Sequence, residues 1–147
     1  MAMKLSMPIG VDDFKKVREN YYFVDKSRFL SAFFPGHAEV TLFTRPRRFG
    51  KTLTLSMLRY FFDLEGADEH RQLFDGLAVS HDAAMMAEMG QRPVLFFTLR
   101  GWKARDWEEM KGTIAIGLQK VAKQYKFLLE SDRVDSHDRS ILKPIYE

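Results

Sequence analysis

The chain has 147 residues, of which 23 are Lys or Arg and 20 are Asp or Glu, so its net charge is +3. This length fits one domain, and a content of 46% hydrophobic and 29% charged residues excludes a disordered chain. The absence of cysteine excludes disulfides and thiolate metal sites, and the small net charge argues against a dedicated nucleic-acid binder, whose basic field covers the whole domain.

The sequence contains no membrane segment and no spacing of metal ligands. No stretch is apolar over the length that crosses a bilayer, and the first ten residues lack the apolar core of a signal peptide. We therefore expect a cytoplasmic protein without membrane partners. The histidines are scattered, without the spacing of a zinc site: His37, His70, His81 and His137.

Two short helices are predicted before residue 36. Residues 12–19 favour a short polar helix, and residues 21–24 favour an extended aromatic stretch. Apolar side chains recur on one helical face of residues 26–34, so Asp25 is predicted to cap a helix that Pro35 ends.

A short apolar strand, a basic turn and a helix are predicted between residues 40 and 64. Residues 40–44 have the composition of a strand, and residues 51–64 form a helical pattern that Gly50 introduces. The start of a helix presents unpaired N–H groups and the positive end of the helix dipole to an anion. This order of elements predicts a phosphate-binding loop.

Lys51 and Thr52 carry the predicted chemistry of this loop. Lys51 is expected to reach the terminal phosphates of ATP, and the Thr52 hydroxyl is expected to ligate Mg²⁺. The usual signature has a glycine where this chain has Arg45, and Pro46 stiffens the turn that glycine normally bends. The predicted nucleotide-binding residues are Arg45, Pro46, Arg47, Arg48, Phe49, Gly50, Lys51, Thr52 and Leu53.

Positive charge is dense in this loop, and the loop has three possible interpretations besides a nucleotide site. Arg45, Arg47 and Arg48 lie close to Lys51, and such a cluster repels itself unless an anion binds, so a polyphosphate is the expected partner. The same side chains could contact the backbone phosphates of a nucleic acid. Arg45 in place of glycine also fits a degenerate regulatory or interaction domain. The last alternative is an ordinary surface turn with Gly50 at its bend.

Beyond residue 64 we predict short helices, one strand and one long helix. Residues 65–68 break the chain, and short helices are expected near 69–74 and 82–89. The continuous apolar run 94–99 is typical of a buried parallel strand. A helix over 106–129 follows.

Asp106 and Glu109 resemble a capping box at the start of this long helix. Apolar residues at spacings of three and four predict a stripe that packs on the sheet. The stripe comprises Trp107, Met110, Ile114, Leu118, Val121, Tyr125 and Leu128.

The chain resembles the bacterial AAA-ATPase-like family. The resemblance rests above all on the loop at 45–53, and it extends to segments 7–14, 21–27, 56–58, 74–77, 92–97 and 107–109. It implies ATP binding with hydrolysis presumed. Members of the family often carry a PD-(D/E)XK nuclease-like domain after the ATPase-like part, so the resemblance makes such a domain a possible partner in the complete protein.

The acidic residue that hydrolysis requires is missing after the loop. In this class it ends a second core strand and holds Mg²⁺ through water. Asp63 belongs to the predicted helix, where we expect it to be solvated. Asp25 precedes the loop, and we expect it to cap a helix or to contact the nucleotide indirectly, through residues that touch it. The catalytic residue is therefore unknown, and we expect nucleotide binding with little turnover.

The predicted fold class is α/β. We expect a P-loop NTPase-like arrangement of three layers with a partly formed parallel sheet, because the strand carrying the acid is missing. Residues 1–36 are predicted as an N-terminal helical and aromatic segment, 37–129 as the P-loop core, and 130–147 as a tail that a complete chain would continue.

Overall fold

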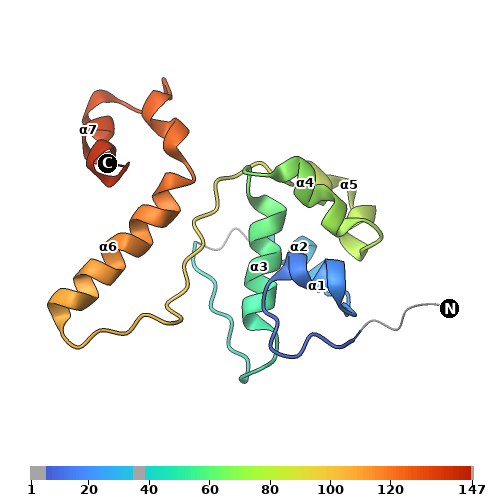
Figure 1. Cartoon of the computed structure of the whole chain (residues 1–147). Helices are drawn as coiled ribbons and strands as arrows, with labels where there is room; N and C mark the ends of the chain where they lie inside the picture. The colour runs from blue at the N-terminus through green and yellow to red at the C-terminus, as the bar shows by residue number, and fades with distance from the viewer. Residues whose placement is uncertain (1–5, 35–38, 147) are drawn as a thin grey trace. The chain divides into compact units, whose positions relative to one another are not determined.

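A computed structural model of the chain describes residues 6–34 and 39–146 (Figure 1). The chain divides into two compact units, Met1–Val94 and Leu95–Glu147. The α-helices are α1 (Phe14–Asn20), α2 (Arg28–Phe33), α3 (Lys51–Phe62), α4 (Ala67–Arg71), α5 (Ala83–Ala87), α6 (Trp107–Lys123) and α7 (Ser136–Tyr146). Short 3-10 helices are η2 (Gln72–Phe74), η3 (Ala78–His81) and η4 (Lys126–Glu130). None of the described helices is long and apolar enough to cross a membrane.

Of the two aspartates predicted to cap helices, Asp106 lies at the N-cap position of α6 and Asp25 lies two residues before the N-cap position of α2. Asp106 caps α6 by accepting the N–H of Glu109 at 2.9 Å, which confirms the predicted start of that helix. One oxygen of Asp25 accepts the N–H of Ser27 at 2.8 Å immediately before α2, and the other accepts the N–H of Ala78 at 2.7 Å. Asp25 therefore joins the start of α2 to the start of η3, although Ser27 is the residue at the N-cap position.

The core of the first unit is aromatic. The Phe74 ring centroid lies 5.0 Å from that of Phe14 and 5.1 Å from that of Phe61, so one ring contacts both α1 and α3. The buried cluster contains Phe14, Leu30, Met57, Phe61, Phe62, Leu73, Phe74, Leu77, Val79, Met85 and Met89. Helix α3 is central to the first unit in Figure 1, and its buried face contributes three members of this cluster.

Polar contacts hold α1 against α3 and η2. The Ser56 hydroxyl of α3 is buried and accepts the N–H of Phe14 at 3.0 Å, which satisfies a backbone donor at the start of α1. Arg18 donates from Nε to the carbonyl of Leu73 at 2.7 Å. These contacts fix the direction of α3, whose first residue is Lys51.

The prediction of a parallel sheet, and with it the α/β fold class, is wrong. Across residues 6–34 and 39–146 the β-type pairing consists of one isolated parallel bridge between Asp63 and Arg92, and no strand forms. Residues 40–44 and 94–99 form neither helix nor strand, and most of their apolar side chains are exposed, at 88% for Val40 and 82% for Leu42. A strand needs a neighbour for its backbone groups, and apolar composition does not say whether that neighbour exists.

The second unit contains helices α6 and α7 joined through η4. Tyr125 is buried there, and its carbonyl accepts a hydrogen bond from the hydroxyl of Tyr146 at 3.1 Å. No residue of α6 is buried, and Trp107 is 64% exposed. The predicted stripe of α6 has no sheet to pack on among the described residues, and much of it faces solvent.

Candidate functional site

The loop before α3 has the backbone geometry of an anion site. Gly50 is the N-cap of α3 in the left-handed conformation, with φ 72 and ψ 21, and Lys51 follows in the right-handed helix. A left-handed residue followed by a right-handed one turns successive N–H groups toward one point, a concavity that binds anions. The first turn of α3 contains no acidic residue and receives no side-chain cap, so its N–H groups fit an external phosphate.

The backbone at position 50 favours glycine. A Cβ built on Gly50 meets no atom within 4 Å, so space is not the constraint. The constraint is the positive φ, which glycine adopts without steric cost.

Arg48 adds a second left-handed residue to the loop. Its φ is 67, and it is the only non-glycine residue with positive φ in the described part of the chain. Such a conformation costs about 1–3 kcal/mol for a residue of this type. Sequence reasoning had no signal for it, because arginine is not a residue type that indicates left-handed backbone.

The ammonium group of Lys51 closes the loop on itself. Its Nζ donates to the carbonyl of Arg45 at 2.5 Å and to the carbonyl of Pro46 at 3.0 Å. Lys51 therefore holds the first two residues of the loop against the start of α3. The three predicted elements of the site, the proline turn, the glycine and the lysine, are brought together.

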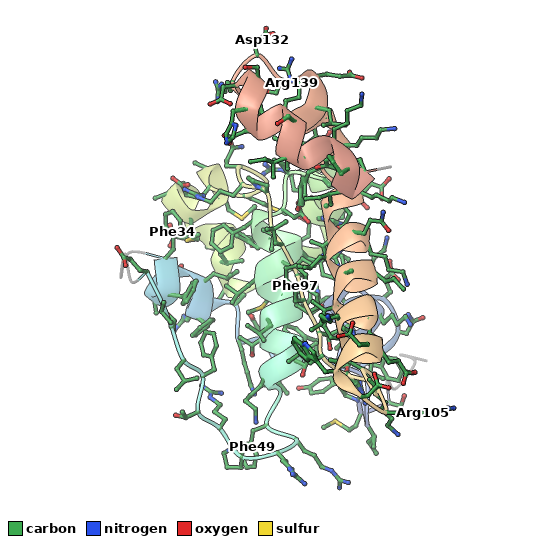
Figure 2. The ribbon with its side chains drawn as sticks, turned by 90° about the vertical axis from the view of Figure 1, so that its left-hand side faces the viewer. Phe34, Phe49, Phe97, Arg105, Asp132 and Arg139 are labelled. Carbon is green, nitrogen blue, oxygen red and sulfur yellow. The ribbon has the colours of Figure 1, made fainter. Side chains whose placement is uncertain are left out.

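The arginines of the loop are exposed. Arg45, Arg47 and Arg48 form no ion pair with any described residue. Phe49 is 60% exposed and lies at the tip of the loop among nitrogen-tipped side chains that project away from the ribbon (Figure 2). Uncompensated positive charge at an exposed turn is an electrostatic site for an anion.

Thr52 and Leu53 follow in the first turn of α3. Thr52 is exposed, as the predicted Mg²⁺ ligand must be, whereas Leu53 packs against the core cluster and anchors the turn. The described residues contain no group of three His, Cys, Asp or Glu side chains that could hold a metal ion. A cation at Thr52 would therefore depend on phosphate oxygens and water for most of its ligands.

Asp63 is not an acidic partner for this loop. It caps the far end of α3, about 18 Å from Lys51 at 1.5 Å per residue. It is also only 2% exposed, which corrects the predicted solvated position. One of its oxygens accepts the N–H of Glu65 at 3.2 Å, and the other lies 3.9 Å from Nε of Arg59, so Asp63 closes the helix end.

Asp25 is occupied by backbone donors. Partial burial alone would raise its pKa, but the N–H groups of Ser27 and Ala78 lower the pKa below its usual value of 3.8. Its role in the structure is to join α2 and η3. No described contact links it to the loop.

Two further features of the first unit were not predicted. Tyr60 donates its hydroxyl to Asp13 at 3.0 Å, and burial together with this contact raises the pKa of Tyr60 to about 12. The rings of His70 and Tyr60 form a T-shaped pair, with centroids 4.7 Å apart. A hollow of about 400 Å³ between α1 and η2 is lined by Lys15, Arg18, Glu19, Glu69, Gln72 and Leu73, a mixed-charge set without a common ligand chemistry.

The chain is similar to a family of known sequence and to a longer bacterial protein. The family described as AAA-ATPase-like, predicted AAA-ATPase, matches residues 8–146. A protein of Azotobacter chroococcum mcd 1, described as an uncharacterized protein in vnfD 5'region, is 37% identical over 111 residues. This match covers 74% of the chain but 20% of the relative, so the chain spans about a fifth of the length of that protein. No solved structure matches the chain.

Proposed function

Since the chain belongs to the AAA-ATPase-like family, we propose that the loop at 45–53 binds the phosphates of ATP together with Mg²⁺ in the cytoplasm. The observation that carries the proposal is the backbone at Gly50 and Lys51, where a left-handed residue opens α3. A phosphate placed there would meet the N–H groups of the first turn and the positive end of the helix.

The polar residues of the loop divide the contacts with the nucleotide and Mg²⁺ among them. Lys51 exchanges the carbonyls of Arg45 and Pro46 for phosphate oxygens, Thr52 ligates Mg²⁺, and the arginines offset the remaining negative charge. ATP hydrolysis belongs to the complete protein, which supplies the missing acid. A nuclease-like domain after the ATPase-like part is a further proposal for that protein.

The test is a calorimetric titration of the chain with ATP, ADP and AMP in the presence of Mg²⁺. We expect ATP to bind far more tightly than AMP, because the contacts of the loop are with terminal phosphates. Lys51→Ala should weaken ATP binding by roughly 10- to 100-fold, the effect of losing one charge-assisted contact. Lys16→Ala, which removes an exposed lysine from α1, is the matched control and should bind ATP as the wild type does.

Three results would contradict the proposal. Equal affinity for AMP and ATP would mean that the loop does not read the phosphate chain. Unchanged ATP affinity in a folded Lys51→Ala variant would make Lys51 an ordinary surface lysine. Absence of affinity for any nucleotide favours the degenerate regulatory domain.

A nucleic-acid contact is the second candidate function. It is favoured by the exposed ring of Phe49, which directly follows the exposed Arg47 and Arg48 and could serve as a stacking platform for a base. The discriminating measurement is binding to short single-stranded DNA at several salt concentrations. Affinity that falls steeply with salt and does not respond to ATP would support this function over the first.

A further inference from the structure

Residues 39–45 form a self-complementary segment at the surface of the first unit. The segment reads Glu-Val-Thr-Leu-Phe-Thr-Arg and leads into the turn before α3 (Figure 1). We propose that it pairs with the same segment of a second copy of the chain, as two antiparallel strands. This ladder joins two chains, so it differs from the parallel sheet within one chain that the structure contradicts. It also does not depend on nucleotide binding.

The backbone of this segment has no partner in the described part of the chain. No hydrogen bond joins an N–H or carbonyl group of residues 40–44 to another described residue. A row of unpaired backbone groups is a template for pairing with another chain. Val, Thr and Phe are residue types that favour strands, and Pro46, which lacks an N–H, ends the run.

The segment is anchored through Phe43 and otherwise uncovered. The ring centroid of Phe43 lies 5.4 Å from that of Phe29 and 6.0 Å from that of Phe33, so the segment is held against α2. Val40 and Leu42 are 88% and 82% exposed. Anchoring reduces the ordering that pairing requires, and a partner strand would remove part of this apolar surface from water.

The charges at the two ends of the segment identify a second copy as the partner. In an antiparallel pair related by a two-fold axis, residue i of one strand faces residue j of the other, and j faces i. With Leu42 on the axis, Glu39 of each copy faces Arg45 of the other, which gives two pairs of opposite charge. The remaining facing pairs are Val40 with Thr44 and Thr41 with Phe43.

The same charges exclude other arrangements of the two segments. A parallel pair in register would place Glu39 against Glu39 and Arg45 against Arg45, which repel. A shift of the antiparallel register by one residue would separate both charge pairs. Neither side chain forms an ion pair with a described residue, so both are available to the partner.

The dimer should be weak. The segment contributes seven residues from each copy, whereas a standard protein interface has about 20–30 residues on each side. We therefore expect association that depends on concentration in the micromolar to millimolar range.

The test is sedimentation equilibrium of the full chain over a range of concentrations, without nucleotide. We expect the wild type to pass from monomer to dimer as its concentration rises. Glu39→Arg places a guanidinium opposite Arg45 of the partner, and Arg45→Glu places a carboxylate opposite Glu39 of the partner. Each variant should dimerise roughly 10-fold more weakly than the wild type, because two attractive pairs become repulsive. An equimolar mixture of the two variants restores both pairs and should dimerise about as well as the wild type.

Two matched controls separate this segment from the rest of the surface. Glu65→Arg reverses the charge of another exposed glutamate of the first unit and should dimerise as the wild type does. Leu42→Lys brings two ammonium groups together on the axis and should weaken the dimer at least as much as Glu39→Arg does. Leu95→Lys changes an apolar side chain that is 61% exposed in the second unit and should have no effect. The replaced side chains are all exposed, so these variants should keep the fold.

Three outcomes would overturn the proposal. A wild-type chain that stays monomeric at every accessible concentration would leave the segment to another part of a longer chain. A mixture of Glu39→Arg and Arg45→Glu that dimerises no better than either variant alone would exclude the antiparallel register. Equal losses in Leu95→Lys and Leu42→Lys would mean that the chain associates through exposed apolar surface in general.

Discussion

The two units use amphipathic helices of similar character with different results. Helix α3, with 12 residues, buries Met57, Phe61 and Phe62 against the aromatic core of the first unit. Helix α6, with 17 residues, buries none of its side chains. Periodic apolar residues suffice to form a helix face, but burial depends on whether other elements cover that face.

The candidate site lies in the first unit, which is the better packed of the two. The loop at 45–50 leads directly into α3, and α3 is held by its buried face and by the Ser56 hydroxyl on the N–H of Phe14. A binding loop keeps its geometry when its supporting element is packed. The second unit has a single buried side chain, Tyr125, among its described residues and provides no comparable support.

The largest expected effect is the contrast between core truncations in the two units. Phe61→Ala should lower the free energy of unfolding by about 3–5 kcal/mol, because it leaves a cavity among fully buried rings. Leu118→Ala, at a half-exposed position of α6, should change it by no more than about 0.5 kcal/mol. Urea unfolding followed by far-UV circular dichroism measures both, and Phe61→Leu is a milder variant if Phe61→Ala does not fold. Similar costs at the two positions would remove the distinction between the units.

Local features of the structure were predictable from the sequence. The start of α6 depends on the capping Asp106 and on the acidic residues of its first turn, and the start of α3 at Lys51 depends on the glycine directly before it. For the same reason the residue pattern alone locates the loop and the helix start that follows it. The backbone at Gly50 follows from the residue type, since glycine is the usual residue at positive φ.

Non-local features were not predictable. Residues 40–44 and 94–99 have strand composition, but pairing requires a partner that the pattern does not contain. Asp63 was predicted to be solvated, but it is buried and forms a β-bridge with Arg92, a residue 29 positions further along the chain that the local pattern does not contain. The left-handed backbone of Arg48 depends on the closure of the whole loop and contradicts the residue's own preference.

The stability of the first unit should depend on pH through His70. Burial lowers the pKa of His70 below its usual 6.5, and the charge of Lys15 on α1 adds to this. Arg59 also lowers the pKa of His70, while Asp63 and Glu69 act in the opposite direction. The buried Nδ1 of His70 forms no hydrogen bond with any described residue, so a proton added there would be unsatisfied.

Protonation of His70 should lower the stability of the folded chain at acidic pH. The unfolded chain binds a proton at His70 at a higher pH than the folded chain does, so this contribution to stability is fully present above pH 6.5. It is lost as the pH falls from 6.5 through the folded pKa. Urea midpoints on both sides of pH 6.5 should diverge for the wild type and converge for His70→Phe, which keeps a ring against Tyr60. His137→Gln in the second unit is the control, and a wild-type slope that persists in His70→Phe would assign the effect to another group.

The smallest expected effect tests whether the second unit has any packing beyond Tyr125. Both tryptophans, Trp102 and Trp107, lie in this unit, so tryptophan emission reports on it alone. A Cβ at Gly112 would meet nothing within 4 Å, whereas a Cβ at Gly117 would overlap the indole ring of Trp102. Both glycines lie inside α6, where replacement by alanine favours the helix by about 0.8–1 kcal/mol.

Gly112→Ala should therefore stabilise the second unit by up to about 1 kcal/mol without changing the emission wavelength. Gly117→Ala should gain less, because the new methyl group displaces Trp102 from the helix, and the emission should shift to the red as the ring enters water. Measuring both in a Trp107→Phe background isolates the signal of Trp102. If both variants gain the same stability and neither shifts the emission, Trp102 does not pack on α6. The contrast with the aromatic core of the first unit would then be sharper, because Tyr125 would be the one well-packed side chain among the described residues of the second unit.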